Sequence, residues 1–204
     1  MHPDPAFAWT DADAIRAFVD TVAFAHIFVA GPNGAAVVHA PVLPVGPDRL
    51  QFHMPYRNRA TPLIANAVVI ASFGGVQGYV SPDWYGVADQ VPSWNYRAVE
   101  AEGLATPLDR DGLISHLDRL SDAHERQLAP KPAWTRHKMS PGRFDAMLGA
   151  IAGYELIVTE WRGTAKLSQN KPARVVDALL AHMPDGALAA EIRSARPAIP
   201  GTRS

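Results

Sequence analysis

Hydrophobic residues change their spacing several times along this chain, and each spacing predicts a different kind of element. The segment "TDADAIRAFVDTVAFA" begins at Thr10, a residue type that often caps helices, and continues with acidic residues in its first turn. Apolar residues then recur at helical intervals, at Ile15, Phe18, Val19 and Val22. This pattern predicts an amphipathic helix near the start of the chain.

From residue 25 onward the apolar residues alternate or cluster in short runs, which is typical of β-strands. The runs are "AHIFVAG", "AAVVHAPVLPVG", "LQFHMP", "VVIASFGG", "VQGYVS" and "SWNYRAVEAEGLATPL". A short helix is expected at "ATPLIANA", where Pro62 falls in the first turn. About six closely connected strands favour an antiparallel barrel or sandwich.

The spacing of apolar residues also predicts that the second half of the chain is mostly helical. Helices are expected at "DRDGLISHLDRLSDAHERQ", with Leu113, Leu117 and Leu120 on one face, at "GRFDAMLGAIAG" and at "PARVVDALLAHM". A long strand, "YELIVTEWRGTAKLSQ", returns to the sheet between the last two. We therefore expect one α+β domain, mainly β, over residues 1–185, with residues 186–204 as a frayed tail.

Composition narrows the class of protein. The chain has 204 residues, 48% of them hydrophobic, which is enough for one sizeable core. Its 19 basic and 20 acidic residues give a formal net charge of −1, so the chain as a whole does not attract nucleic acid or anionic membrane. Without cysteine it has no disulfide, thiolate nucleophile or Cys-based zinc site. Neither a signal peptide nor a membrane span is recognisable, so a cytoplasmic protein is expected.

Large aromatic residues gather around two proline breaks in the segment Gly74–Gly103. They are Trp84, Tyr85, Trp94 and Tyr96. Tryptophan and tyrosine combine a flat apolar body with a polar tip, which suits a planar ligand or a subunit interface. The same side chains also suit the closed end of a barrel, where they would belong to the core.

Two further segments carry polar chemistry. In "FHMPYRNRATPL", Arg57 and Arg59 follow a strand and precede a helix, an arrangement that binds phosphate but that also occurs as a solvated turn. In "GTAKLSQN", a continuing strand would put Lys166 and Ser168 on one face and Leu167 on the other. Such a strand end could bind a heteroaromatic ligand or could cap the next helix.

Other kinds of site find no support in the sequence. The eight histidines are dispersed, and His39 and His53 are the only pair expected on neighbouring strands. No common zinc-ligand spacing occurs, so a metal site is not expected. A G-x-S-x-G elbow and a G-x-G-x-x-G fingerprint are also missing, which argues against a serine hydrolase and a Rossmann nucleotide site.

Taken together, "YVSPDWY", "VPSWNYRAVEAEG" and "GTAKLSQNK" resemble the PaiB family of FMN-binding negative transcriptional regulators. In that family an I-S-P-x-W-Y block precedes V-P-T-W-N-Y, and G-x-x-K-L-S-Q-N lies far downstream. The three blocks occur here in the same order. The resemblance implies a split β-barrel that binds FMN, built as a homodimer with the flavin at the subunit interface.

The resemblance also implies which residues contact the flavin. The loop after "LQFH" would hold the phosphate, the backbone from Ser72 to Tyr79 would follow the isoalloxazine edge, and "KLSQN" would hold flavin or a substrate stacked on it. The implied cofactor-binding residues are Arg57, Asn58, Arg59, Ser72, Phe73, Gln77, Tyr79, Trp94, Lys166, Ser168, Gln169 and Asn170.

One departure from the family pattern falls in the phosphate loop. The pattern reads roughly H-x-A-R-x-N-P, and His53 and Asn58 fit it, whereas Tyr56 stands where an arginine is expected. Either Arg57 or Arg59 takes over the phosphate, or this chain binds flavin weakly or not at all.

Three functions are compatible with these patterns. The first is a flavin-binding homodimeric regulator. The second is a flavin-dependent oxidoreductase on the same barrel, with Lys166, Tyr85 and His53 as candidate proton donors, although the histidine that relatives carry near Val76 or Gln77 is missing. The third is a repressor that binds DNA directly, which the balanced charge and the lack of a helix-turn-helix pattern disfavour.

Overall fold

The computed structural model describes residues 2–196, which divide into two compact units. Unit 1 contains residues 2–15, 74–99 and 162–196, and unit 2 contains residues 16–73 and 100–161. Both units are therefore assembled from segments that are distant in the sequence. The predicted single domain over residues 1–185 stays a prediction.

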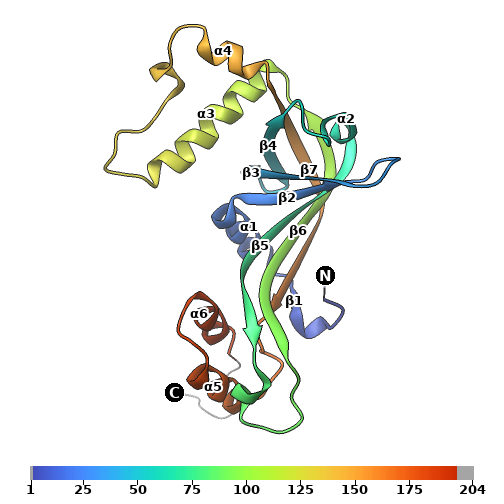
Figure 1. The fold of residues 1–204 in the computed structure, drawn as a ribbon, viewed down its shortest axis with the longest axis vertical. Helices are drawn as coiled ribbons and strands as arrows, with labels where there is room; N and C mark the ends of the chain where they lie inside the picture. Colours follow the sequence, from blue (N-terminus) through green and yellow to red (C-terminus); the bar gives the residue numbers. More distant parts are fainter. Residues whose placement is uncertain (1, 197–204) are drawn as a thin grey trace. The chain divides into compact units, whose positions relative to one another are not determined.

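Unit 2 holds an antiparallel β-barrel (Figure 1). Its strands are β2 (Phe24–Val29), β3 (Ala36–Gly46), β4 (Arg49–Pro55) and parts of β5 (Ala67–Val80), β6 (Ser93–Pro107) and β7 (Ile151–Lys166). They follow the order β7-β4-β3-β2-β5-β6, and β6 also pairs with β7, which closes the barrel. This arrangement confirms the predicted fold class, α+β and mainly β, of the split β-barrel type.

Alternation along each strand decides which side chains fill the barrel. On β2, Ala25, Ile27 and Val29 are buried, whereas the three residues between and before them face outward. Strand β2 pairs with β3 from Phe24–Pro41 to Val29–Ala36, and β4 pairs with β7 over its whole length. Because the side-chain period of a strand is two, this register keeps one face of each strand in the core.

The closest backbone approach in unit 2 involves a glycine of β6. A Cβ built on Gly103 would lie 2.0 Å from the carbonyl oxygen of Ile157 on β7. No side chain larger than hydrogen fits there without moving a strand.

The helices of unit 2 begin close to the predicted residues, but some of them end earlier than predicted. They are α2 (Thr61–Ile64), α3 (Arg110–Arg126) and α4 (Arg143–Leu148). Asp109 caps α3, because its carboxylate accepts a hydrogen bond of 2.7 Å from the backbone N–H of Gly112. The helix expected across "GRFDAMLGAIAG" was wrong in its second half, since strand β7 already begins at Ile151 and pairs with β4.

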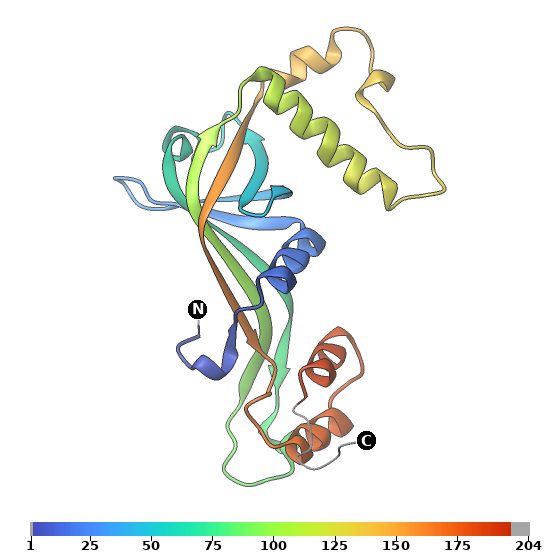
Figure 2. The same ribbon diagram turned by 180° about the vertical axis from the view of Figure 1, so that it is seen from behind.

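Unit 1 has its own small apolar core. Its elements are η1 (Pro5–Phe7), β1 (Ala8–Trp9), η2 (Pro82–Tyr85), α5 (Ala173–His182) and α6 (Ala187–Ser194), together with parts of β5, β6 and β7. Helix α1 (Ala12–Val22) begins in unit 1 and ends in unit 2. Helices α5 and α6 lie side by side in both ribbon views (Figure 2). The buried core residues are Val80, Tyr85, Leu167, Val175, Val176, Leu179, Met183, Ala189 and Ile192.

Two sequence-based expectations need correction. The runs "VVIASFGG" and "VQGYVS" are not separate strands but parts of one strand, β5. The expected frayed tail from residue 186 instead contains α6, because Ala189 and Ile192 are apolar enough to be buried in the core of unit 1. Residues 197–204 of that tail lie outside the described residues.

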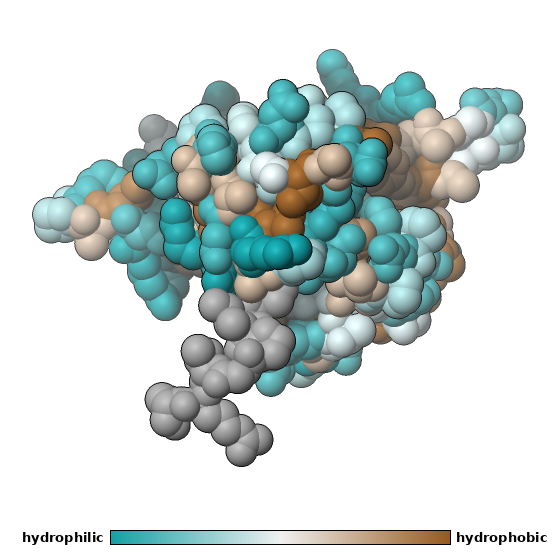
Figure 3. All heavy atoms as spheres, turned by 90° about the horizontal axis from the view of Figure 1, so that it is seen from below, coloured by the Kyte–Doolittle hydropathy of each residue, from teal (hydrophilic) through white to brown (hydrophobic). Residues whose placement is uncertain are grey.

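The surface is mixed in character. Seen from below, polar residues cover most of it and apolar patches lie between them (Figure 3), as is usual for a folded protein. Within residues 2–196, no helix has the length and apolar character that crossing a membrane requires.

The glycine of β6 gives a test of the barrel. We expect Gly103→Ala to lower the free energy of unfolding by about 3 kcal/mol, because the added methyl group collides with the backbone of β7. Gly74→Ala on β5 is the matched control, since a Cβ there meets nothing within 4 Å. Urea unfolding measures both variants, and equal stabilities would contradict the close approach.

Candidate functional site

The polar segment after β7 leaves the strand earlier than its alternation predicts. Strand β7 ends at Lys166, and Ser168 has a φ of 62°, in the left-handed region. Leu167 is buried in the core of unit 1, as predicted, but Ser168 is buried as well, at 3% exposure. Lys166 and Ser168 do line the same cavity, as their predicted position on one face implies, although the strand ends between them and Ser168 is reached by a turn of the backbone.

Ser168 is the centre of a buried hydrogen-bond network in unit 1. Its Oγ accepts from Nδ2 of Asn95 at 2.8 Å and lies 2.9 Å from Oη of Tyr85. Asn95 is 1% exposed and Tyr85 is 4% exposed. The two hydroxyl groups carry two protons, and the bond between them uses one. One O–H donor is therefore left over in this network.

Gln169 completes the strand end rather than facing outward. Its Oε1 accepts from the backbone N–H of Leu167 at 2.8 Å, and its Nε2 donates to the carbonyl oxygens of Ala6 and Ala165. These bonds occupy both ends of the amide, so Gln169 supports the turn. Asn170 is exposed.

Two lysines lie beside this network. Lys166 donates to Oγ of Ser93 at 2.8 Å, and Lys171 donates to Oε1 of Gln90 at 2.7 Å. Each Nζ also lies near an aromatic ring, 5.9 Å from the centroid of Phe7 for Lys166 and 5.5 Å from that of Tyr85 for Lys171. Both ammonium groups therefore have only neutral partners in the described residues.

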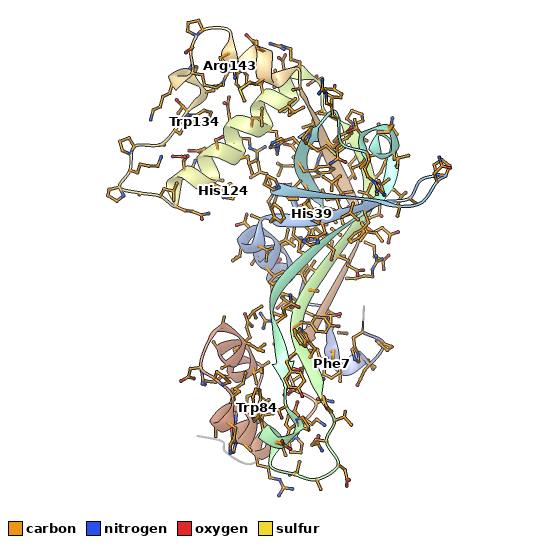
Figure 4. All side chains as sticks on the ribbon, in the orientation of Figure 1. Phe7, His39, Trp84, His124, Trp134 and Arg143 are labelled. Atoms are coloured by element: carbon orange, nitrogen blue, oxygen red, sulfur yellow. The ribbon has the colours of Figure 1, made fainter. Side chains whose placement is uncertain are left out.

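These side chains enclose a cavity of about 230 Å³ within unit 1, which we call the strand-end cavity. It is lined by His2, Phe7, Tyr85, Gln90, Val91, Ser93, Asn95, Lys166, Ser168, Asn170 and Lys171. None of these residues is acidic. Phe7 lies on the N-terminal segment of unit 1 (Figure 4).

A second group of predicted residues meets on neighbouring strands of unit 1. Nε1 of Trp94 donates to Oε1 of Gln77 at 3.2 Å, and the Trp94 ring lies edge-on to Tyr79 with 6.4 Å between centroids. Trp94 and Tyr79 are each 49% exposed, so their rings offer an apolar surface to solvent. Two other aromatics of this region behave differently: Tyr85 belongs to the core of unit 1, and Trp84 packs against it (Figure 4).

The predicted phosphate loop lies in unit 2, between β4 and α2. Asn58 shapes it, because its Oδ1 accepts from the backbone N–H of Ala60 at 2.9 Å. Arg59 donates from Nη2 to the carbonyl oxygen of Ala35. Arg57 is exposed and no described residue pairs with it. Of the three predicted residues, Arg57 is thus the one whose whole guanidinium group remains for a ligand.

Ser72 and Phe73 are the remaining predicted cofactor-binding residues in unit 2. Ser72 faces outward on β5, opposite His26 of β2. Phe73 is completely buried, so only its backbone could contact a ligand. This agrees with the expectation that β5 would meet a flavin through its backbone.

Histidine pairs differ from the prediction. His39 and His53 do lie on the neighbouring strands β3 and β4, but His39 faces His26 with 4.6 Å between ring centroids. His53 instead bonds through Nδ1 to Nε2 of His116 at 3.1 Å. Sequence reasoning missed both contacts, since His116 comes from the distant helix α3. No group of three or more metal-ligating side chains occurs in the part of the chain that the structure describes.

The environment of the His53–His116 pair favours neutral rings. Burial lowers the pKa of His116 to about 4, and the nearby positive charges of His53 and Arg119 add to the shift. Burial also lowers the pKa of His53. The hydrogen bond between Nδ1 of His53 and Nε2 of His116 needs a proton on one of these two nitrogens and a lone pair on the other. A proton on both nitrogens would break it.

The residues present fit a flavin in kind. In unit 2, the exposed guanidinium group of Arg57 suits a phosphate. In unit 1, the exposed rings of Tyr79 and Trp94 suit a planar ring system. Sequence reasoning missed Asn95, Ser93 and Lys171 as polar groups of the strand-end cavity. The quoted motifs "SWNY" and "SQNK" contain all three, but only the folded backbone shows that they meet.

The chain was compared with known families and proteins. Residues 1–160 match the family described as "Putative FMN-binding domain". "Protease synthase and sporulation protein PAI 2" from Bacillus subtilis (strain 168) is 28% identical to this chain, over 84% of this chain and 83% of that protein. These matches confirm the resemblance to PaiB and FMN as the expected cofactor.

Solved structures with the same fold include two flavoproteins. The FAD and heme binding protein from Mycobacterium smegmatis has a TM-score of 0.59 and 18% identity, covering 92% of this chain and 79% of that one. The flavocytochrome Anf3 from Azotobacter vinelandii has a TM-score of 0.59 and 16% identity, covering 81% and 72%. At these identities the similarity establishes the fold alone.

The histidine pair gives a pH prediction. In the folded protein His116 binds a proton only near pH 4, whereas in the unfolded chain it does so near pH 6.5. Lowering the pH from 6.5 to 4 therefore favours unfolding, by about 3 kcal/mol from this group. Urea unfolding across this range measures the loss.

A variant and a control isolate the effect. His116→Leu should flatten the fall in stability below pH 6.5, because it removes the buried titrating ring. His124→Gln, on the exposed face of α3, should leave the fall unchanged. An identical pH dependence in wild type and His116→Leu would disprove the assignment.

Proposed function

This chain belongs to the family of FMN-binding domains that matches residues 1–160, and we propose on that premise that it is a homodimeric FMN-binding regulator of transcription. The family match is the observation that carries the proposal. In this proposal, regulation acts through the bound ligand rather than through direct DNA binding. The chain has nearly equal numbers of acidic and basic residues, so as a whole it does not attract DNA. The similarity to PAI 2 over most of both chains supports the same role.

The phosphate of FMN is held by the loop between β4 and α2. Arg57 supplies an exposed guanidinium group, and Arg59 supplies a second one that is partly engaged with Ala35. Asn58 keeps the loop in shape through its bond to Ala60. In this proposal Arg57 replaces the arginine that the family pattern has at the position of Tyr56.

The isoalloxazine edge of the flavin is contacted by the part of β5 in unit 2, where Ser72 and Phe73 contribute backbone groups. In unit 1, Gln77, Tyr79 and Trp94 form a separate exposed group that suits a planar ligand. The remaining predicted residues, Lys166, Ser168, Gln169 and Asn170, lie at the end of β7 in unit 1 and are assigned to a second ligand rather than to the flavin.

The homodimer forms through the outer face of β2 and β5 in unit 2. Phe24, Phe28 and Val68 are 46%, 40% and 63% exposed on this face. Ile70 lies opposite Phe28 and adds to the same apolar surface. Several large apolar residues exposed on one sheet face are typical of a subunit interface. Ser72 lies on the same face, which agrees with a flavin at the interface.

A flavin-dependent oxidoreductase is the second candidate. The observation that favours it is the left-over O–H of the Tyr85–Ser168 pair, which lines the strand-end cavity and could deliver a hydrogen bond or a proton. Bound flavin would supply the redox chemistry, and the protein would position the substrate. Steady NAD(P)H oxidation by the flavin-loaded protein would favour this candidate over regulation alone.

Flavin titration tests the phosphate loop. Arg57→Gln should weaken FMN binding by at least tenfold but leave riboflavin binding unchanged, because riboflavin lacks the phosphate. Quenching of flavin fluorescence measures both affinities. Arg143→Gln, an exposed arginine of α4, is the control and should change neither. Wild-type protein that fails to quench FMN would refute flavin binding itself.

Light scattering after size exclusion tests the interface. Wild type should have twice the mass of the chain, and Phe28→Asp should convert it to monomer, because the charge would be buried in an apolar contact. Leu128→Asp, at another exposed apolar position, should remain a dimer. A dimeric Phe28→Asp protein would place the interface elsewhere.

A further inference from the structure

The strand-end cavity carries two positive charges that no described side chain neutralises. Lys166 and Lys171 both line it, and their partners are neutral. Three arginines of unit 1 are instead paired with carboxylates: Arg97 with Glu191, Arg193 with Asp185 and Arg196 with Asp177. Two unneutralised ammonium groups around one cavity attract an anion.

The cavity wall offers several hydrogen-bond donors that its own side chains do not use. The two ammonium groups have more N–H bonds than their partners use, and the Tyr85–Ser168 pair has one O–H left over. Asn95 uses one N–H of its amide on Ser168 and retains another. The burial of Asn95 and Ser168 fixes these donors in place. A ligand that only accepts hydrogen bonds matches this wall, and a carboxylate is such a group.

The size of the cavity limits the ligand. Its volume of about 230 Å³ lies below the roughly 300–1,000 Å³ of sites for drug-sized molecules. At roughly 30 Å³ for each water-sized group, about eight such groups fit. A whole flavin is larger than this, whereas a small organic acid fits. Phe7 and Val91 give the cavity an apolar part beside the cations.

We propose that the strand-end cavity is a binding site for the carboxylate of a small organic acid, held by Lys166 and Lys171 and by the left-over donor of the Tyr85–Ser168 pair. The site is separate from the proposed flavin contacts and does not depend on them. A bound acid would connect β6, the end of β7 and the N-terminal segment within unit 1. In a ligand-responsive regulator, this acid would be the effector.

Calorimetric titration of the full chain with benzoate and benzamide tests the site. The two probes have nearly the same shape, but only benzoate carries a charge. Benzoate should bind at least tenfold more tightly than benzamide. Lys166→Gln and Lys171→Gln should each weaken benzoate binding about tenfold, because each removes one charge-assisted hydrogen bond.

A lysine outside the cavity provides the matched control. Lys138→Gln removes the same charge from the surface of unit 2 and should leave benzoate binding unchanged. Equal binding of the two probes, or no effect of Lys166→Gln and Lys171→Gln, would overturn the proposal.

Flavin titrations of the same variants exclude the phosphate of FMN as the occupant. If Lys166→Gln weakened FMN binding but not riboflavin binding, the cavity would hold the flavin phosphate and the proposal would fail. Unchanged flavin affinities together with weakened benzoate binding would support it. If only the flavin assignment were wrong, Arg57→Gln would not weaken FMN binding, whereas the benzoate affinities would still follow the prediction.

Discussion

One buried serine hydroxyl determines how the end of β7 is built. Ser168 receives the amide of Asn95 and bonds to Tyr85, and its left-handed backbone turns the chain away from the strand. Without this hydroxyl, the buried amide of Asn95 would lose its acceptor, at a cost of about 1–3 kcal/mol. The turn sends Leu167 into the core and leaves the two lysines on the cavity wall.

The two units treat ionisable groups in different ways. In unit 2, His53 and His116 form a buried pair, and burial lowers the pKa of both rings and so favours their neutral forms. In unit 1, Lys166 and Lys171 are only partly buried, so water still reaches their side chains. Neutral rings add to the stability of the barrel, whereas hydrated cations remain free to exchange a neutral partner for an anion.

Much of the fold was predictable because its signals are local. Alternation identified β2, β3, β4 and β6, and helical spacing identified α1, α3 and α5. The errors arose where residues distant in the sequence determine the local structure. Ile151 belongs to a strand because it pairs with β4, and α6 forms because its apolar residues pack into the core of unit 1. Motifs located the polar residues of the strand end. The turn at Ser168 and the role of Gln169 depend on bonds that spacing alone does not reveal.

The discontiguous make-up of the two units has a consequence for biosynthesis. Unit 2 needs the chain as far as Trp161, and unit 1 needs both the first residues and α5 and α6. Neither can be completed while the ribosome is still translating the middle of the message, so β4, whose neighbour β7 is the last strand, must wait with one edge unpaired. A nascent chain of this kind stays vulnerable to aggregation until late in synthesis, and it offers no contiguous fragment that could be expressed as an independent half.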